Sequence, residues 1–101
     1  MANWVKVGSV DEFTGQVMVY RGSEKPIAIF RLLDGFYAIE DVCSHEEASL
    51  SEGEIENDQV ECPRHGAKFA IKTGKNLTLP AVLPVKSFSV KVENGDILVE
   101  M

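Results

Sequence analysis

The residues that could do chemistry gather in one stretch, residues 43–66. Cys43 and His45 open this stretch, Cys62 and His65 close it, and sixteen residues lie between His45 and Cys62. They are the only two cysteines and the only two histidines of the 101-residue chain. Each pair offers one thiolate and one imidazole, a donor set that suits a soft or borderline metal. The spacing therefore predicts one metal centre held between two loops.

Two kinds of metal centre fit this donor set. A structural zinc site with two Cys and two His is chemically possible, although zinc fingers usually group Cys with Cys and His with His. The other is a [2Fe–2S] cluster in which two Cys hold one iron and two His hold the other. A disulfide between the cysteines would leave the paired histidines unexplained, and nothing marks the chain as secreted. The mixed content of each pair favours the two-iron centre over zinc.

The composition predicts one domain, residues 1–101, without affinity for nucleic acid or membranes. The formal net charge is −6 and the pI is near 4.8, whereas phosphate neutralisation requires clustered Lys and Arg. No run approaches the ~20 apolar residues that a membrane helix needs. The first residues have no apolar signal core. We therefore expect a cytoplasmic protein without a membrane anchor.

Acidic residues are concentrated within and just before the metal-binding stretch. Two interpretations are open: an ordinary solvated surface, or an acidic face that steers a basic partner towards the metal. Nine acids and no Lys or Arg lie in this region: Glu40, Asp41, Glu46, Glu47, Glu52, Glu54, Glu56, Asp58 and Glu61.

Short alternating segments and turn signals predict an all-β fold, a small antiparallel sandwich or barrel. Ser9 and Glu12 have the spacing of a capping box, which predicts a single helical turn. Asn94-Gly95 is a signal for a type I′ hairpin turn. The expected strands span residues 4–7, 16–21, 26–33, 36–40, 53–56, 59–62, 67–71, 87–92 and 96–100.

Each Cys/His pair is predicted to follow a hairpin. The first hairpin turns at Asp34-Gly35, another type I′ signal, and leads to Cys43. The second turns at Asn57-Asp58 and leads to Cys62. Both pairs then lie in loops carried by rigid strands, which is the usual placement for chemical function.

On these motifs the sequence resembles the Rieske family, and most closely the soluble ferredoxin components of ring-hydroxylating dioxygenase systems. The resemblance implies the Rieske fold, with a cluster-binding subdomain of two loops, about residues 41–82, inserted in a basal β domain. The matching residues are Cys43-Ser44-His45, Cys62-Pro63-Arg64-His65-Gly66, Ala48-Ser49-Leu50-Ser51-Glu52-Gly53, Phe69 and Thr73-Gly74.

The resemblance also implies one Rieske-type [2Fe–2S] cluster and the role of each ligand. Cys43 and Cys62 would ligate the buried iron, and His45 and His65 the outer iron, which takes up the electron. Gly66 would allow the backbone to come close to the cluster.

The surroundings of the cluster are predicted from the same resemblance. Backbone N–H groups of residues 45–50 and 64–68 are expected to donate to cluster sulfurs, and Leu50, Phe69 and Pro80 to exclude water. High-potential members carry a hydroxyl where this chain has Ala67. Fewer donors and nearby acids destabilise the reduced cluster, so we predict a potential of about −150 mV.

The implied function is that of a soluble one-electron carrier, not of an enzyme by itself, because four protein ligands leave no open coordination site. It would accept electrons from an NAD(P)H-dependent flavin reductase and pass them to a terminal oxygenase, as a monomer. Glu46 and Glu47, beside the first His, are the candidate docking residues. The alternatives are a small subunit docked to a larger oxidoreductase such as nitrite reductase, or a zinc-stabilised structural module.

Overall fold

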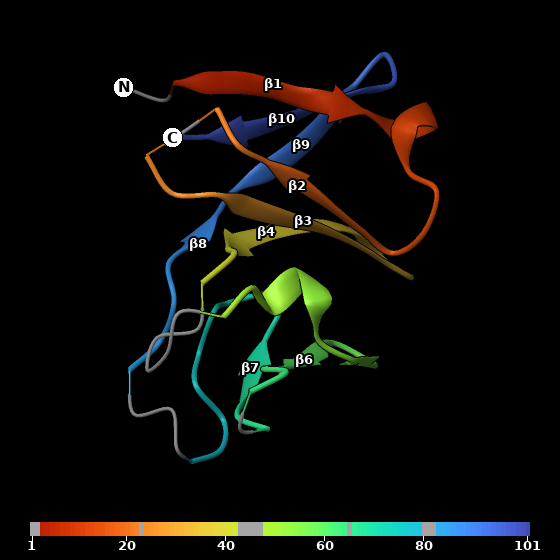
Figure 1. The fold of residues 1–101 in the computed structure, drawn as a ribbon. Coiled ribbons are helices and arrows are strands. Elements are labelled where there is room, and N and C mark those ends of the chain that lie inside the picture. Colours follow the sequence, from red (N-terminus) through yellow and green to blue (C-terminus); the bar gives the residue numbers. More distant parts are fainter. Residues whose placement is uncertain (1–2, 23, 43–47, 65, 80–82) are drawn as a thin grey trace.

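The computed structural model describes residues 3–22, 24–42, 48–64, 66–79 and 83–101. Its short strands pair antiparallel in three stacked sheets (Figure 1). We call them the top sheet (order β1-β10-β9), the middle sheet (β2-β3-β4-β8) and the bottom sheet (β5-β6-β7). The strands are β1 (Trp4–Ser9), β2 (Val17–Tyr20), β3 (Ile27–Leu32), β4 (Gly35–Glu40), β5 (Ile55–Glu56), β6 (Gln59–Glu61), β7 (Lys68–Ala70), β8 (Ser87–Phe88), β9 (Val90–Glu93) and β10 (Asp96–Glu100). Two 3-10 helices, η1 (Val10–Glu12) and η2 (Leu50–Glu52), complete the described elements. The predicted all-β antiparallel fold is confirmed.

The middle sheet is buried on both faces. Along β3, Ile27 and Ile29 pack in one apolar cluster with Ile97 of the top sheet. The alternate residues, Ala28 and Phe30, pack in a second cluster with residues of the bottom sheet. Successive side chains of a strand point to opposite faces, so an uninterrupted apolar run is what a strand between two layers requires. Fully burying each large side chain stabilises the fold by about 1.5–3 kcal/mol.

The hairpin of β3 and β4 forms as predicted, but the prediction of a type I′ turn at Asp34-Gly35 is wrong. The strands pair through Leu32 and Gly35, so Leu33 and Asp34 are the central turn residues. A type I′ turn requires positive φ at both central residues. Here only Gly35, which begins β4, has a positive φ, +144°. The strand pairing therefore ends one residue earlier than predicted and places Gly35 in the ladder.

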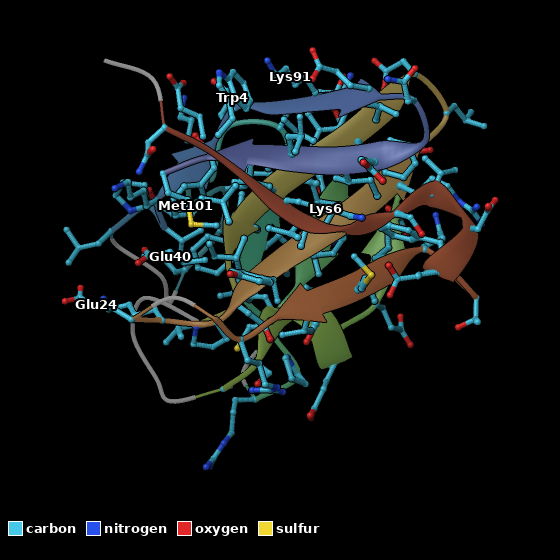
Figure 2. The ribbon with its side chains drawn as sticks, turned by 90° about the horizontal axis from the view of Figure 1, so that it is seen from above. Trp4, Lys6, Glu24, Glu40, Lys91 and Met101 are labelled. Atoms are coloured by element: carbon cyan, nitrogen blue, oxygen red, sulfur yellow. The ribbon has the colours of Figure 1, made fainter. Side chains whose placement is uncertain are left out.

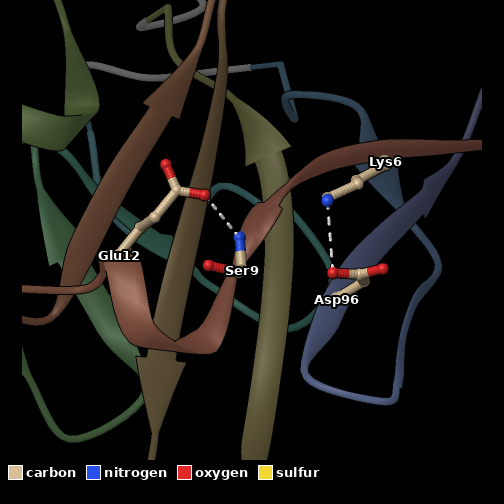
Figure 3. Close-up of polar contacts among 4 residues, drawn as sticks. All are labelled: Lys6, Ser9, Glu12 and Asp96. Atoms are coloured by element: carbon tan, nitrogen blue, oxygen red, sulfur yellow. Dashed lines mark hydrogen bonds and ion pairs between the residues drawn. The ribbon is translucent and has the colours of Figure 1, made fainter.

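The predicted type I′ turn at Asn94-Gly95 is confirmed. Its two residues have φ of 52° and 83°, and Glu93 pairs with Asp96 across the turn. The hairpin joins β9 to β10, and β10 also pairs with β1. Lys6 of β1 lies 3.3 Å from the Asp96 carboxylate at the start of β10 (Figure 3).

The single helical turn predicted after Ser9 is confirmed as η1. The Ser9 N–H donates to the Glu12 carboxylate at 2.8 Å, which satisfies one backbone group at the helix start (Figure 3).

At the other end of β1, the Lys91 ammonium of β9 lies 4.4 Å from the centre of the Trp4 ring (Figure 2). This cation–π contact joins two strands that are not hydrogen-bonded neighbours in the top sheet.

The predicted strand 87–92 is divided in the structure. β8 pairs with β4 of the middle sheet, whereas β9 pairs with β10 of the top sheet. Ser89 lies between them, and its carbonyl accepts from the Glu100 N–H at 2.9 Å. The alternation of the sequence continues through this point because the chain stays extended while it changes sheets.

Candidate metal centre

The second ligand loop begins at Cys62, directly after β6. It is closed by backbone hydrogen bonds: the Cys62 N–H donates to the Ala67 carbonyl at 2.7 Å, and the Gly66 N–H donates to the Cys62 carbonyl at 3.1 Å. Gly66 has a φ of +75°, a left-handed conformation that a Cβ disfavours. The glycine is therefore required by the turn itself, in addition to any approach to a cluster.

The Cys62 thiol has the surroundings expected of a buried ligand. It is fully buried, forms no disulfide, and belongs to the apolar cluster that contains Leu50, Ala67 and Phe69. Leu50 and Phe69, which were predicted to exclude water from the cluster, are both fully buried, and their role at the cluster stays a prediction. An apolar shell excludes water from a metal centre and sets its potential. The described part of the site therefore fits an iron–sulfur ligand.

Gly53 supports the start of the second loop from the other side. A Cβ built on this residue would overlap the Glu61 carbonyl oxygen, one residue before Cys62. The Glu61 N–H also donates to the Glu54 carbonyl at 2.9 Å. The chain that leaves η2 thus runs in direct contact with the chain that enters the second loop. In the sequence, Gly53 stood out only as part of a motif and of an expected strand. A glycine gives no local signal that a distant segment of backbone will pack against it.

Three of the four predicted ligands, Cys43, His45 and His65, lie outside the described residues. The same holds for Glu46, Glu47 and for Pro80, which was predicted to shield the cluster. Within the described ranges, no three His, Cys, Asp or Glu side chains come together. The complete ligand set therefore stays a prediction.

The first ligand segment is flanked by a buried carboxylate that the sequence did not single out. Asp41 is 1% exposed, and its carboxylate accepts from the N–H of Ser51 at 2.6 Å and from its hydroxyl at 2.8 Å. The Asp41 N–H donates to the Pro26 carbonyl at 2.9 Å. The two ends of residues 41–51 are therefore joined. No local pattern reports a contact between residues ten positions apart.

Two of the nine acids, Glu40 and Asp41, do not fit the interpretation as an ordinary solvated surface, and the steering face stays a prediction. Asp41 is buried, and the Glu40 carboxylate accepts from the Lys86 N–H at 3.0 Å and lies 3.6 Å from the Lys25 ammonium (Figure 2 labels Glu40). Both carboxylates are therefore hydrogen-bonded or paired with groups of the protein itself. Exposed acids remain on and beside the bottom sheet: Glu52, Glu54, Glu56 and Asp58.

Two of the N–H groups expected to donate to cluster sulfurs are used elsewhere. The Gly66 N–H closes its own loop, and the Lys68 N–H donates to the Thr78 hydroxyl at 2.9 Å. The Leu77 N–H donates to the Lys68 carbonyl at 2.8 Å. Residues 77–78 therefore run along the end of the second ligand loop.

An exposed ion pair joins the middle sheet to the bottom sheet at the β3–β4 turn. The Lys72 ammonium donates to the Asp34 carboxylate at 2.8 Å. This hydrogen bond holds the pKa of Asp34 below its ordinary value of 3.8 and raises the pKa of Lys72 above 10.5. The pair borders an open groove of about 430 Å³ together with Leu33 and Asn57.

Comparison with known proteins relates nearly the whole chain to one family. Residues 3–89 match the Rieske [2Fe-2S] domain. The ferredoxin component of biphenyl 2,3-dioxygenase from Rhodococcus jostii (strain RHA1) is 41% identical over 93 residues, 92% of this chain and 87% of that protein. The ferredoxin subunit of 3-phenylpropionate/cinnamic acid dioxygenase from Shigella flexneri serotype 5b (strain 8401) is 53% identical over 76 residues, 74% of this chain and 72% of that protein.

A solved structure extends this relationship to the fold. The complex of reduced oxygenase and oxidized ferredoxin in carbazole 1,9a-dioxygenase contains a chain with a TM-score of 0.87 and 38% identity. The match covers 96% of this chain and 92% of that chain. The resemblance found in the sequence is therefore confirmed.

The chain belongs to the Rieske [2Fe-2S] family, and its cofactor is one Rieske-type [2Fe–2S] cluster. Within that family it is a ferredoxin, an electron carrier and not an enzyme by itself. The zinc module is thereby excluded. No helix among the described residues is long and apolar enough to cross a membrane.

Proposed function

We propose that this ferredoxin carries single electrons from an NAD(P)H-dependent flavin reductase to the terminal oxygenase of a ring-hydroxylating system. The observation that carries the proposal is the match of nearly the whole chain to ferredoxin components of dioxygenases. A solved relative is bound to its oxygenase. Exchange between two partners requires a carrier that docks transiently, so we also propose a monomer that acts in the cytoplasm.

We further propose that Cys43 and Cys62 ligate the inner iron and that His45 and His65 ligate the outer iron. The buried Cys62 thiol in its apolar shell supports an inner position. When bound, the cluster accepts and releases one electron. The protein chain contributes the burial of the thiol and the backbone turn at Gly66 that presents it. Because Ala67 supplies no hydroxyl, we keep the predicted potential of about −150 mV.

The cluster can be tested on the purified protein. We expect a red-brown protein with two iron and two sulfide per chain that takes up one electron in a reductive titration. Substitution of Cys62 by Ser should remove most of this absorption, because it removes one thiolate ligand. A colourless, zinc-loaded protein would contradict the proposed ligand set.

Two exposed leucines, one of them beside the end of the second ligand loop, support a docking face for the oxygenase. Leu79 is 77% exposed and Leu83 is 61% exposed. Leu79 follows directly on Thr78, whose hydroxyl is hydrogen-bonded to Lys68 at the end of that loop. Exposed apolar side chains that gather beside a functional site are typical of protein interaction surfaces. We propose that this leucine pair contacts the oxygenase, together with Glu46 and Glu47.

The docking proposal predicts slower electron transfer in the double variant Leu79→Ser with Leu83→Ser. Losing about 1.4 kcal/mol of apolar contact lowers affinity tenfold, and two leucines can supply that amount. Oxidation of the reduced protein by the biphenyl 2,3-dioxygenase oxygenase, followed by stopped flow, should slow about tenfold at low oxygenase concentration. Substitution of Glu46 and Glu47 by Lys should slow reduction by a basic partner.

The matched control is Leu33→Ser, because Leu33 is fully exposed but lies at the β3–β4 turn, at the other end of β4 from Asp41. Its transfer rate should equal that of the wild type, and chemical reduction by dithionite should be the same in all variants. Equal oxidation rates for the Leu79/Leu83 variant and the Leu33 variant would rule out the leucine docking face. A loaded protein that transfers no electrons to the oxygenase would contradict the proposed partner.

A further inference from the structure

One charged side chain lies inside the described part of the protein. Asp41 is 1% exposed and is the one charged or polar residue that is buried within these ranges. An ionised carboxylate is costly to bury unless hydrogen bonds compensate the lost water. The contacts of this side chain must therefore compensate for its burial, and they indicate what it holds in place.

Ser51 binds both oxygens of the Asp41 carboxylate. Its backbone N–H lies 2.6 Å from one oxygen and its hydroxyl 2.8 Å from the other. Ser51 is the middle residue of η2, which follows the first ligand segment, whereas Asp41 directly follows β4. The Asp41 N–H is bonded to the Pro26 carbonyl, so the joined ends are also attached to the chain just before β3.

We propose that Asp41 is the positioning residue of the first ligand loop. Its carboxylate clamps Ser51 and so fixes where the loop that contains Cys43 and His45 begins and ends. This inference rests on the proposed ligand set. Asp41 is well placed for this role in the sequence, because only Val42 lies between it and Cys43.

Asp41 also carries a carboxylate two positions before Cys43, a proposed ligand of the cluster. A buried charge acts through a medium of lower effective dielectric than water. A negative charge opposes the uptake of an electron by a neighbouring centre. Asp41 thus has two separable effects, a geometric one through Ser51 and an electrostatic one through its charge.

Two variants separate these effects. Asp41→Asn keeps the side-chain shape: its carbonyl oxygen can accept from the Ser51 N–H and its amide can donate to the Ser51 hydroxyl, while the charge is lost. Ser51→Ala keeps the charge and the backbone bond but removes the hydroxyl bond. Ser49→Ala is the matched control, because Ser49 is a serine of the same segment whose side chain makes no cap hydrogen bond.

The readouts are iron and sulfide content, the midpoint potential, and the EPR g values of the reduced protein. Asp41→Asn should shift the one-electron equilibrium towards the reduced state by about tenfold, which corresponds to about 59 mV. Ser51→Ala should change the g values and lower cluster retention, because the loop ends are held less rigidly. Ser49→Ala should match the wild type in all three readouts.

The proposal is overturned if Asp41→Asn and Ser51→Ala match Ser49→Ala in potential and g values, even if they unfold at a lower temperature. That result would show a purely structural side chain. Measuring the wild type first separates this failure from failure of the proposed ligand set. A wild type without two iron and two sulfide contradicts the ligand set, whereas a loaded wild type with unaffected variants contradicts only the role of Asp41.

Discussion

The two ligand segments of this ferredoxin are closed by different chemistry. The second loop is closed by backbone hydrogen bonds between Cys62 and Ala67 and between Gly66 and Cys62. The first is closed by a side chain, through Asp41 and Ser51. Closure by backbone hydrogen bonds depends on the φ angles of the loop and on close approach of backbone segments. It is therefore sensitive mainly to substitution of glycines. Side-chain closure depends on the identity of two residues.

Strand register explains why the two closures differ. Glu61 and Lys68 are directly paired in the ladder of β6 and β7, so the sheet itself holds both ends of the second loop together. The first segment leaves the end of β4 and enters η2, and no described ladder pairs its two ends. A hydrogen-bonded side chain replaces the missing ladder. This comparison predicts glycine-sensitive stability around the second loop.

The largest effect is expected for Gly53→Ala. The new methyl group would overlap the Glu61 carbonyl, so the chain entering the second loop must shift. Overpacking of this kind costs about 1–3 kcal/mol. Urea unfolding should show this loss, together with lower iron content. Gly15→Ala is the control, because nothing lies within 4 Å of its Cβ position; equal stability of the two variants would show that residues 53 and 61 are not in tight contact.

A smaller effect is expected for Gly66→Ala. Its Cβ would have room, 3.6 Å from the Glu61 carboxylate, so the cost comes from the φ of +75° alone. A left-handed conformation costs a residue with a Cβ about 1–2 kcal/mol. Gly66→Asn should recover part of this loss, since Asn adopts the conformation more readily. If Ala and Asn unfold at the same urea concentration, backbone strain is not the cause.

The smallest effect is expected for Lys72→Met, which removes the exposed contact with Asp34 between the middle and bottom sheets. The variant should melt slightly below the wild type at neutral pH and low salt, because exposed ion pairs contribute little. Lys75→Met, a nearby exposed lysine, is the control. High salt should reduce the difference.

The pH dependence of this difference follows from the two pKa shifts. The pKa of Asp34 is lowered in the folded protein, so the contact stabilises it above the ordinary value of 3.8 and is lost as pH falls through the lowered value. The pKa of Lys72 is raised, so the contribution is lost only above 10.5. The melting difference should therefore be constant from about pH 5 to 9 and shrink in acid. A difference that persists below the pKa of Asp34 would exclude the ion pair as its cause.

Local signals in the sequence were sufficient for features that local chemistry decides. Asn94-Gly95 specifies its turn because both residues adopt positive φ readily. Asn57-Asp58 likewise connects the predicted hairpin of β5 and β6. The Cys/His spacing identified the cofactor because few centres use that donor set.

Features decided by distant contacts were missed or misjudged. The turn at Asp34-Gly35 is a local exception, because the actual pairing partner of Gly35 is Leu32, only three residues away. Residues 87–92 alternate like one strand, although they divide at Ser89 between two sheets. Asp41 was assigned to an acidic run because its partner, Ser51, lies ten residues away. The division at about 41–82 into a cluster-binding subdomain stays a prediction.

The pairing of β1 with β10 has a consequence for the order of assembly. Trp4 is opposite Glu100 in that ladder, so the first strand has no partner until the last one has been synthesised. Contacts so distant in sequence form late, because closing a long loop costs conformational entropy before the contacts stabilise the chain. The middle and bottom sheets, whose strands are close in sequence apart from β8, can form earlier. The second ligand loop, which is held between β6 and β7, can then form before the top sheet closes over β3.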